Sequence, residues 1–286
     1  MPIADSEIDA PLLLERYRPL GLLARGGMST VFRGRDEVLG RDVAIKLFRA
    51  GTALDVDRYL GEMQVLAGLS HHGVVSIIDA GIDGSTPTDP RPFLVMELVR
   101  GKTITDTLAE RELSVHQSGE IGYEVAETLE YIHSNGVIHR DITPSNIMLV
   151  DYGTKSSRAR ARLTDFGIAI DASAPPAPSK TTATGTAAYL SPEQVARKPL
   201  TTASDIYSLG LVLLECFTGK RAFPGAPVES AMRRITDDPE IPRSIPKPWA
   251  KLLRAMTARD PDGRPSAAEV TEAARLALRS TTRDPA

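Results

Sequence analysis

The sequence predicts an α+β fold, in which a small strand-rich part of the chain precedes a larger, mainly helical part. Residues 17–48 read as short apolar strands separated by glycine-containing turns. After Val99 the apolar residues recur at helical spacing instead, most clearly in Ser114–His133. This change of periodicity divides the chain of 286 residues into two regions.

The elements follow from periodicity and turn residues. Strands are expected at Tyr17–Ala24, Thr30–Arg35, Val43–Phe48, Val74–Ala80 and Pro92–Leu98, with one helix from about Asp55 to Leu69. Later helices are expected at Ser114–His133, Thr202–Thr218, Pro227–Thr236, Trp249–Ala258 and Ser266–Leu278. The domain boundaries expected are a tail at 1–14, a small lobe at 15–98, a larger lobe at 99–278 and a tail at 279–286.

Composition excludes several classes of protein. The net charge of -3 gives no chain-wide basic field for nucleic acid. The acidic start at residues 1–10 does not resemble a signal peptide, and the longest apolar run is shorter than the roughly 20 residues that cross a bilayer. The single cysteine, Cys216, fits a small buried hydrophobe better than a catalytic thiol. We therefore expect a soluble, cytoplasmic protein.

Two N-terminal segments carry groups suited to a polyphosphate. Glycines at 26–27, between two predicted strands, let backbone N–H groups approach phosphate oxygens, although an ordinary hairpin turn explains the same pair. The strand Val43–Phe48 contains a single lysine, Lys46, amid apolar residues. It is either a solvated charge or a cation held by a carboxylate such as Glu62 on the following helix.

A polar cluster lies between apolar residues at 137–149. Its members are His139, Arg140, Asp141 and Asn146. A buried hydrogen-bond network serving stability alone is one interpretation. The Asp165-Phe166-Gly167 motif that follows favours a catalytic interpretation instead. In that interpretation, Asp141 orients an attacking hydroxyl or accepts its proton. Asn146 and Asp165 then offer oxygen ligands to Mg²⁺, and phosphoryl transfer needs little more than such positioning and charge stabilisation.

Together these segments resemble the eukaryotic-type protein kinase family, in its bacterial serine/threonine branch. The motifs stand in the family's order and spacing: the Gly-rich loop, Val-Ala-Ile-Lys at 43–46, His-Arg-Asp at 139–141 with Asn146, Asp-Phe-Gly at 165–167 and Ser-Pro-Glu at 191–193. The resemblance covers residues 15–278. It implies the two-lobed kinase fold, with an antiparallel sheet and one helix in the small lobe, and ATP-dependent phosphorylation of protein serine or threonine.

The resemblance also implies roles. Asp141 would be the catalytic base, Asn146 and Asp165 would hold Mg²⁺ (or Mn²⁺), and Lys46 would bind the α- and β-phosphates while pairing with Glu62. The nucleotide-binding set implied is Leu23, Ala24, Gly26, Gly27, Met28, Ser29, Thr30, Val31, Ala44, Lys46, Met96, Glu97, Val99 and Met148.

Within that set the adenine ring has its own neighbours. The resemblance implies that it is sandwiched by Val31, Ala44 and Met148. Met96 would guard the back of the pocket, and the backbone of Glu97 and Val99 would hydrogen-bond the ring edge. Leu66 and Phe166 would belong to an apolar stack that locks the active arrangement. For all these apolar residues, ordinary core packing fits the sequence equally well.

Residues 185–193 resemble the segment that shapes the family's peptide-binding site. Thr186 marks serine/threonine specificity there. Glu193 would form a buried ion pair with Arg264, and Asp205 would hydrogen-bond the backbone around 139–140. Because these last three belong to the framework, their substitution should harm folding as well as rate.

The predicted activation loop is rich in hydroxyl groups. The phosphorylation candidates are Ser179, Thr181, Thr182 and Thr184, with Thr181 and Thr182 favoured. A phosphate there would pair with Arg140 and order the loop. The alternative is a loop that is polar only because it is exposed.

Three residues depart from the family pattern. Ala24 and Ser29 replace the first and third glycines of the phosphate loop. Thr143 stands where serine/threonine kinases carry a lysine that contacts the γ-phosphate, and losing such a cation can cost about 10²–10³ in rate. Reduced activity is therefore expected. A weakly active or inactive pseudokinase that serves as a nucleotide-binding scaffold is the alternative function, and a small-molecule phosphotransferase is a second one.

The remaining expectations concern partners. ATP and protein substrates with serine or threonine acceptors follow from the resemblance, whereas nucleic acid and a membrane segment in this chain are not expected. A homodimer through the small lobes stays open. The basic connection Asp151–Arg162 is interpreted as a solvated hairpin loop, with a docking site as the alternative.

Overall fold

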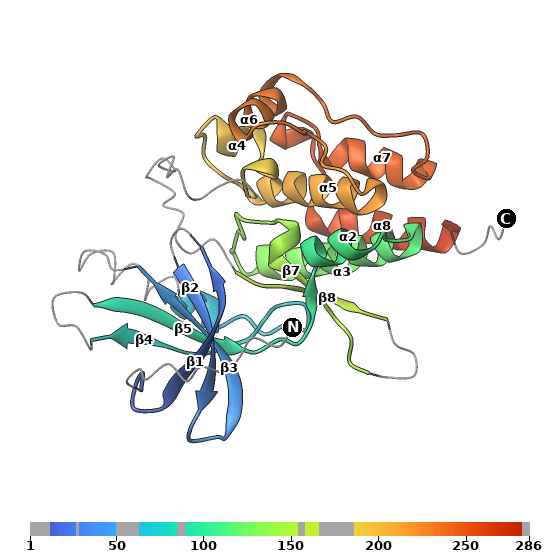
Figure 1. Cartoon of the computed structure of the whole chain (residues 1–286). Helices are drawn as coiled ribbons and strands as arrows, with labels where there is room; N and C mark the ends of the chain where they lie inside the picture. The colour runs from blue at the N-terminus through green and yellow to red at the C-terminus, as the bar shows by residue number, and fades with distance from the viewer. Residues whose placement is uncertain are drawn as a thin grey trace. The chain divides into compact units, whose positions relative to one another are not determined.

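The chain forms two compact units in a computed structural model, which describes residues 12–26, 29–49, 63–84, 90–153, 158–165 and 186–281. The first unit comprises Met1–Ser70 and Val75–Val99, and the second comprises His71–Val74 and Arg100–Ala286. The first unit carries strands β1 to β5, whereas the helices α2 to α8 belong to the second (Figure 1). The α+β class expected from the sequence is confirmed.

The first unit contains one antiparallel sheet in the order β1-β2-β3-β5-β4. Its strands are β1 (Tyr17–Arg25), β2 (Ser29–Asp36), β3 (Arg41–Phe48), β4 (Ile77–Asp83) and β5 (Arg91–Glu97). All five predicted strands are present, but β4 begins three residues later than predicted. Val74 instead bridges to Leu163 and belongs to the second unit. Of the predicted helix at 55–69, the described residues 63–67 are helical and end before Gly68.

The two faces of this sheet differ in composition. The core cluster of the first unit takes Val43 and Ile45 from β3 together with Phe93 and Val95 from β5. Because side chains alternate along a strand, Ala44 and Lys46 lie on the opposite face. This separates the core-building residues of β3 from those that the sequence assigned to nucleotide binding.

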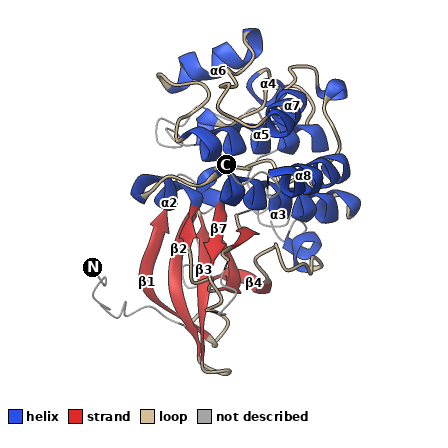
Figure 2. Cartoon of the chain, turned by 90° about the vertical axis from the view of Figure 1, so that its right-hand side faces the viewer, coloured by secondary structure: helices blue, strands red, loops and turns tan. Residues whose placement is uncertain are grey.

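The second unit holds the helices and a small sheet (Figure 2). The helices are α2 (Ile104–Glu110), α3 (Val115–Ser134), α4 (Pro192–Val195), α5 (Thr202–Thr218), α6 (Pro227–Thr236), α7 (Lys247–Met256) and α8 (Ala267–Thr281). The sheet has the order β6 (Lys102–Thr103), β7 (Ile147–Val150), β8 (Arg160–Leu163). Single 3₁₀ turns lie at Pro144–Asn146, Thr186–Ala188 and Pro261–Gly263.

Helix α5 forms the centre of this unit, since it is buried almost all round its circumference. Its apolar run at 209–214 is fully enclosed, and Cys216 is 1% exposed, as expected for a buried hydrophobe. Burial raises the pKa of the Cys216 thiol, which disfavours the reactive thiolate. Close packing of α3 needs small residues, because a Cβ at Gly119 would meet the Trp249 indole of α7.

Helix starts follow side-chain capping. Ser114 caps α3 and accepts a hydrogen bond from the Gln117 backbone, while the Gln117 side-chain oxygen accepts one from the Ser114 backbone N–H. This confirms the predicted start. Thr103 and Asp106 form the same capping box at α2, a helix that the sequence analysis did not predict. Among the described residues, no helix combines the length and apolar character needed to cross a membrane.

Part of the segment interpreted as a solvated hairpin loop is strand β8, and two of the segment's basic residues have a partner in α3. Arg158 and Arg160 both pair with Glu124, at 3.0 and 2.7 Å. The second oxygen of Glu124 accepts a hydrogen bond from the Ala161 backbone at 2.7 Å. These contacts hold β8 against α3. The basic residues of the segment therefore help to position the strand that precedes Asp165.

Candidate active site

The catalytic loop is anchored by apolar side chains on both sides of its polar residues. Ile142 is 1% exposed and Ile147 is not exposed at all. Between them, Pro144–Asn146 forms a 3₁₀ turn with proline at its first position, where the missing N–H costs no hydrogen bond. The loop then enters β7, which pairs with β8 and thereby lies beside the strand that leads to Asp165.

Asn146 holds Asp141 in place. Its side-chain nitrogen Nδ2 donates to the Asp141 carboxylate oxygen Oδ2 at 2.8 Å and to the Asp141 carbonyl at 2.9 Å. The Asn146 carbonyl accepts from the backbone of Thr164, at 3.0 Å, next to Asp165. Because the amide nitrogen is used toward Asp141, the side-chain oxygen of Asn146 is the atom that can serve as a hard-cation ligand.

His139 connects the catalytic loop to the segment before Asp165. The ring is fully buried, with Nε2 3.2 Å from the Thr164 carbonyl and Nδ1 3.4 Å from the Asp141 backbone nitrogen. A neutral imidazole that donates through Nε2 and accepts at Nδ1 satisfies both contacts. Arg140 and Asp165 adopt positive φ, 69° and 57°. Such conformations in non-glycine residues are costly and gather at functional sites.

Asp205 fixes the same loop from α5. Its two carboxylate oxygens accept from the backbone nitrogens of His139 and Arg140, each at 2.8 Å, so the hydrogen bonds predicted from the sequence are present. The ring of His133 lies 2.9 Å from one of these oxygens. Asp205 is 1% exposed. A buried carboxylate with two charge-assisted bonds to one loop strongly restricts that loop.

The predicted ion pair between Glu193 and Arg264 is also present. Arg264 donates to both carboxylate oxygens, at 2.8 and 2.9 Å, and Ser204 donates to one of them at 2.6 Å. The other three N–H groups of Arg264 reach backbone carbonyls: those of Ala258, Ala203 and Arg259. All five donors of the guanidinium therefore have acceptors. The pair holds α4, α5 and the segment at 258–264 together.

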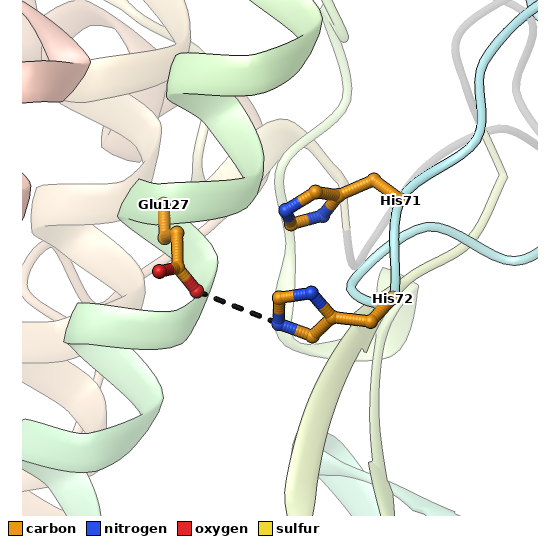
Figure 3. A group of neighbouring side chains, drawn as sticks. All are labelled: His71, His72 and Glu127. Atoms are coloured by element: carbon orange, nitrogen blue, oxygen red, sulfur yellow. Dashed lines mark ion pairs between the residues drawn. The ribbon is translucent and has the colours of Figure 1, made fainter.

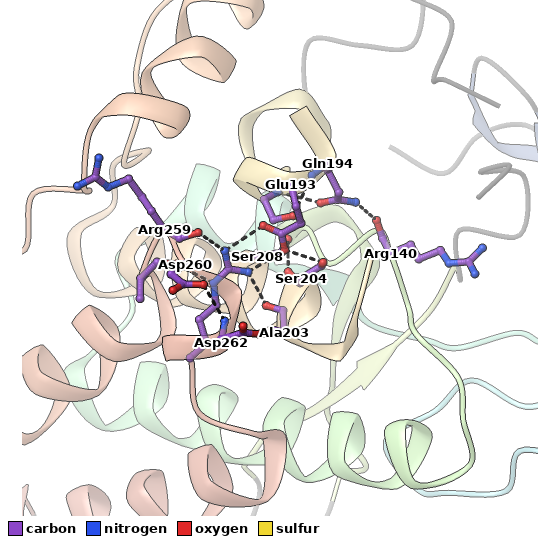
Figure 4. A network of polar contacts seen from close by, with 12 residues as sticks. Arg140, Glu193, Gln194, Ala203, Ser204, Ser208, Arg259, Asp260 and Asp262 are labelled. Carbon is purple, nitrogen blue, oxygen red and sulfur yellow. Dashed lines mark hydrogen bonds and ion pairs between the residues drawn. The ribbon is translucent and has the colours of Figure 1, made fainter. Parts of the chain in front are cut away.

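Gln194 ties this framework to the catalytic loop. Its side-chain nitrogen donates to the Arg140 carbonyl at 2.8 Å (Figure 4). The oxygen of the same amide accepts from the Ser191 backbone at 2.8 Å, within the capping box that starts α4. One side chain therefore joins the predicted peptide-site segment to the residue preceding Asp141.

A buried cation lies behind the same segment. Arg234 of α6 is fully buried and donates to the Leu190 carbonyl at 3.3 Å and to Ser230 Oγ at 2.7 Å. Burial lowers the pKa of Arg234 to about 10. Among the residues that the structure describes, no carboxylate pairs with it. Thr186 begins the neighbouring 3₁₀ turn, and its side chain lies outside the described residues.

In the first unit, Lys46 is buried on the sheet face opposite the core cluster. Its cross-strand partners are Val31 in β2 and Leu94 in β5, and Ala44 pairs with Met96. Directly paired residues share a face of the sheet, so the structure brings Val31, Ala44, Lys46 and Met96 together. The Lys46 ammonium lies 5.5 Å from the Phe48 ring centroid. Lys46 therefore lies beside the apolar residues Val31, Ala44 and Met96 on this face.

The predicted phosphate loop closes the β1–β2 hairpin. Ala24 pairs with Val31 and Arg25 with Thr30, and an irregularity in the register falls at Leu23. The Gly26 nitrogen donates to the Ser29 carbonyl at 2.8 Å. Among the remaining predicted residues, the Glu97 backbone nitrogen donates to the Ser76 carbonyl at 3.0 Å. Val99 and Met148 are half-buried, and Thr143 is buried. Leu66 is buried in the first unit.

Several predicted residues lie outside the described part of the chain. They are Gly27, Met28, Glu62, Phe166, Gly167, Ser179, Thr181, Thr182 and Thr184. The pairing of Lys46 with Glu62 and the arrangement of the activation loop therefore stay predictions.

Comparison with known proteins decides the family. A model of the protein kinase domain matches residues 17–274. The chain belongs to the protein kinase family. It is 39% identical over 238 residues to the serine/threonine-protein kinase PknB of Mycobacterium leprae, a match covering 81% of this chain and 37% of PknB. PknB of Mycolicibacterium smegmatis is 38% identical, covering 88% of this chain and 41% of the relative.

A different bacterial kinase, PknA, supports the same family assignment. Serine/threonine-protein kinase PknA of Mycobacterium tuberculosis is 33% identical over 252 residues, covering 86% of this chain and 57% of PknA. The kinase matches therefore run along most of this chain, whereas the chain spans only about two fifths to three fifths of the length of these relatives. Membership of the serine/threonine protein kinase family, which uses ATP with a divalent metal, is thereby established.

Two residues of this protein kinase site, Gln194 and Arg234, were not predicted from the sequence, and neither was the contact that a third, His139, makes. Gln194 could have been found from the Ser-x-x-Gln capping pattern at 191–194, although that pattern gives no hint of its contact with Arg140. His139 was noticed as part of the polar cluster, but its bridge to Thr164 depends on a fold contact. Arg234 had no local signal, because a basic residue in an amphipathic helix is ordinarily exposed.

Proposed function

We propose that this chain transfers the γ-phosphoryl group of ATP to serine or threonine hydroxyls of proteins. The observation that carries the proposal is the Asp141–Asn146 pair in a loop that Asp205 fixes through two backbone hydrogen bonds. A carboxylate held in this way is suited to one task, which is to orient a hydroxyl and accept its proton.

Asp141 acts on the acceptor in this proposal. It orients the hydroxyl for attack and takes its proton as the oxygen–phosphorus bond forms, while the phosphoryl group leaves ADP. Asn146 keeps the Asp141 carboxylate in position, and its own side-chain oxygen and the Asp165 carboxylate are hard oxygen donors that suit Mg²⁺. When bound, the metal neutralises the charge of the phosphates.

The first unit supplies the nucleotide-binding groups in the proposal. Lys46 provides a cation for the α- and β-phosphates, and Val31, Ala44 and Met96 provide apolar surface on the same sheet face. The backbone at Glu97 and Val99 is proposed to bind the adenine edge. Glu62 is proposed as the partner that orients Lys46.

Acceptor-dependent ADP formation tests this function. The chain is incubated with Mg²⁺ and ATP, and ADP is measured with and without a generic basic protein. We expect ADP formation that rises with the acceptor and is matched by phosphate on the protein. ADP formation that is independent of every protein acceptor, with no phosphate on the chain itself, would contradict the proposal.

Thr143→Lys is expected to increase turnover, by up to about 10²-fold, because it restores a cation near the developing phosphoryl charge. Thr143 is 4% exposed and precedes the 3₁₀ turn at 144–146. Steady-state kinetics with a protein acceptor measures the effect. Thr143→Met is the matched control, since it has similar length without charge and should not increase turnover. An unchanged or lower rate for the lysine variant would show that the site is adapted to threonine.

Autophosphorylation of the activation loop is expected as well. After incubation with Mg²⁺ and ATP, mass spectrometry should find phosphate on the peptide containing 179–184, with Thr181 and Thr182 the favoured positions. Arg140 is proposed to receive this phosphate. The Asp141→Asn chain should remain unmodified. An unmodified peptide from an active preparation would contradict this prediction and leave the transfer to other proteins intact.

Thr143 also supports a second candidate function. An uncharged, buried residue at this position fits a pseudokinase that binds nucleotide as a scaffold. The two functions differ in a simple measurement, because the scaffold binds ATP without forming ADP.

The composition supports a cytoplasmic location for either one.

A further inference from the structure

Two histidines and a glutamate meet on the surface of the second unit, apart from the residues assigned to catalysis. His71 and His72 belong to the turn at 71–74, and Glu127 belongs to α3 (Figure 3). One ligand atom from each lies within 4.8 Å of the other two. The closest pair is His72 Nε2 and Glu127 Oε2, 3.4 Å apart. Both histidine rings lie on the side of the turn that faces this part of α3 (Figure 3).

The turn is held firmly against α3. The His71 ring stacks on Tyr131, with centroids 4.9 Å apart and an angle of 17° between the planes. The Gly73 nitrogen donates to His71 Nδ1 at 3.1 Å. Gly73 itself has no room for a side chain, because a Cβ would overlap the Thr128 hydroxyl of α3. Thr128 is in turn fixed by its 2.7 Å bond to the Glu124 carbonyl. His71 therefore has a set position before any ligand arrives.

Glu127 is oriented by a neighbour on its own helix. Tyr123 donates through its hydroxyl to Oε1 of Glu127 at 3.1 Å, which leaves Oε2 as the oxygen directed at His72. An outer hydrogen bond of this kind orients a carboxylate ligand in many metal sites. Burial and the neighbouring His72 lower the pKa of His71, against an opposing effect of Glu127.

We propose that His71, His72 and Glu127 form a binding site for Zn²⁺. Imidazole nitrogens with a carboxylate oxygen are a donor set that this ion takes in proteins. With bonds of about 2.0–2.1 Å in tetrahedral geometry, neighbouring ligand atoms lie about 3.3–3.4 Å apart. The separation of 3.4 Å between His72 and Glu127 already matches this edge. Water would complete the fourth position.

Bringing His71 into the same coordination shell requires a small movement of the other two side chains. His72 is 60% and Glu127 34% exposed, so both side chains can turn toward the fixed His71 ring. His71 accepts at Nδ1 from Gly73, and its ring proton is therefore on Nε2. Binding through Nε2 moves that proton to Nδ1 and gives up the Gly73 bond. The expected affinity is consequently lower than that of a closed structural site with cysteine ligands.

The position suggests a structural ion. The Gly73 carbonyl accepts from the Leu163 backbone at 2.7 Å, and the Val74 carbonyl accepts from the Arg162 side chain at 2.8 Å. The turn that carries both histidines therefore borders β8, which leads into Asp165. A bound ion would fasten this turn to α3 from outside. The proposal does not depend on phosphoryl transfer.

Calorimetric titration of the full chain with zinc sulfate, in buffer with excess Mg²⁺, tests the site. We expect one Zn²⁺ per chain for the native protein. His72→Ala and Glu127→Gln should each weaken binding by about tenfold or more, because each removes a ligand. The matched control is His116→Ala: the exposed His116 lies 3.5 Å from Glu120 on the same helix, a His–Glu pair without a second histidine. It should bind as the native chain does.

A second measurement guards against misfolded variants. Circular dichroism first shows that each variant retains the native helix content. Co²⁺ is then added to the same proteins, and the native chain and His116→Ala should develop the visible absorption of a four-coordinate site, whereas His72→Ala should not. No stoichiometric Zn²⁺ binding by the native chain, or equal binding by all folded variants, would overturn the proposal.

Discussion

Asp141→Asn is expected to reduce phosphoryl transfer by about 10²–10⁴-fold, which is the range that a positioned general base contributes. The amide of asparagine cannot accept the hydroxyl proton, although it has nearly the same shape as the carboxylate. The loop is held by Asp205 and by the buried residues Ile142 and Ile147, and none of these contacts involves the Asp141 side chain. The fold and the binding of ATP should therefore be retained.

The measurement is the turnover number with a protein acceptor, accompanied by the ATP dissociation constant. Ser145→Ala provides a matched control in the same loop, because Ser145 is exposed and its side chain contacts Thr105 of α2 at 3.0 Å. It should keep turnover within a few fold of native. If Asp141→Asn retained a comparable turnover, Asp141 would not be the base, and the proposed chemistry would be wrong.

Glu193→Ala is expected to destabilise the second unit by about 3–5 kcal/mol, the usual cost of leaving one member of a buried ion pair uncompensated. Arg264 would lose two of its five acceptors, and the Ser204 hydroxyl would lose its partner. Reversible denaturation by urea measures the free energy of unfolding. A loss of less than about 1 kcal/mol would place this pair among the weak surface pairs and contradict its framework role.

A double variant separates the pair from its surroundings. Replacing both partners with apolar residues, Glu193→Leu and Arg264→Met, should cost less than the sum of the single changes, because no buried charge remains. The three backbone carbonyls that Arg264 serves would still lose their donor. Some destabilisation is therefore expected to remain in the double variant.

The same pair predicts a dependence on pH. Burial alone would raise the pKa of Glu193, but hydrogen bonds from Arg264 and Ser204 outweigh it, and the pKa is lowered. A carboxylate with a lowered pKa in the folded state stabilises the protein above its unfolded pKa. That contribution is lost as the pH falls through the lowered value. The native chain should consequently lose more stability on acidification than the double variant does.

The strands and long helices were predictable from the sequence because their periodicity is local. Ser114, with Gln117 three residues later, marks the start of α3, and the all-apolar run at 209–214 indicates a buried α5. Strand β4 was misplaced at its start because the apolar residues Val74 and Val75 fit a strand equally well. Their use is decided by the bridge between Val74 and Leu163, which no local pattern contains.

For the candidate site, the sequence motifs located the functional residues. They did not reveal the hydrogen bonds that hold those residues in place. The resemblance supplied Asp141 and Asn146, while the bond between them depends on the 3₁₀ turn that brings residue 146 back toward residue 141. Gln194, His139 and Arg234 act across sequence separations of 25 to 54 residues, where periodicity carries no information. Thr143 was visible as a departure from the family, and its effect on rate is a question for kinetics.

Transfer of label from γ-labelled ATP with Mg²⁺ tests the central claim most directly. The native chain and the Asp141→Asn chain are each incubated alone and with a generic basic protein, and the phosphorylated amino acids are identified. The proposed function predicts label on serine or threonine with the native chain and almost none with Asp141→Asn. No label with the native chain, in a preparation that binds ATP, would contradict the proposal and favour the scaffold.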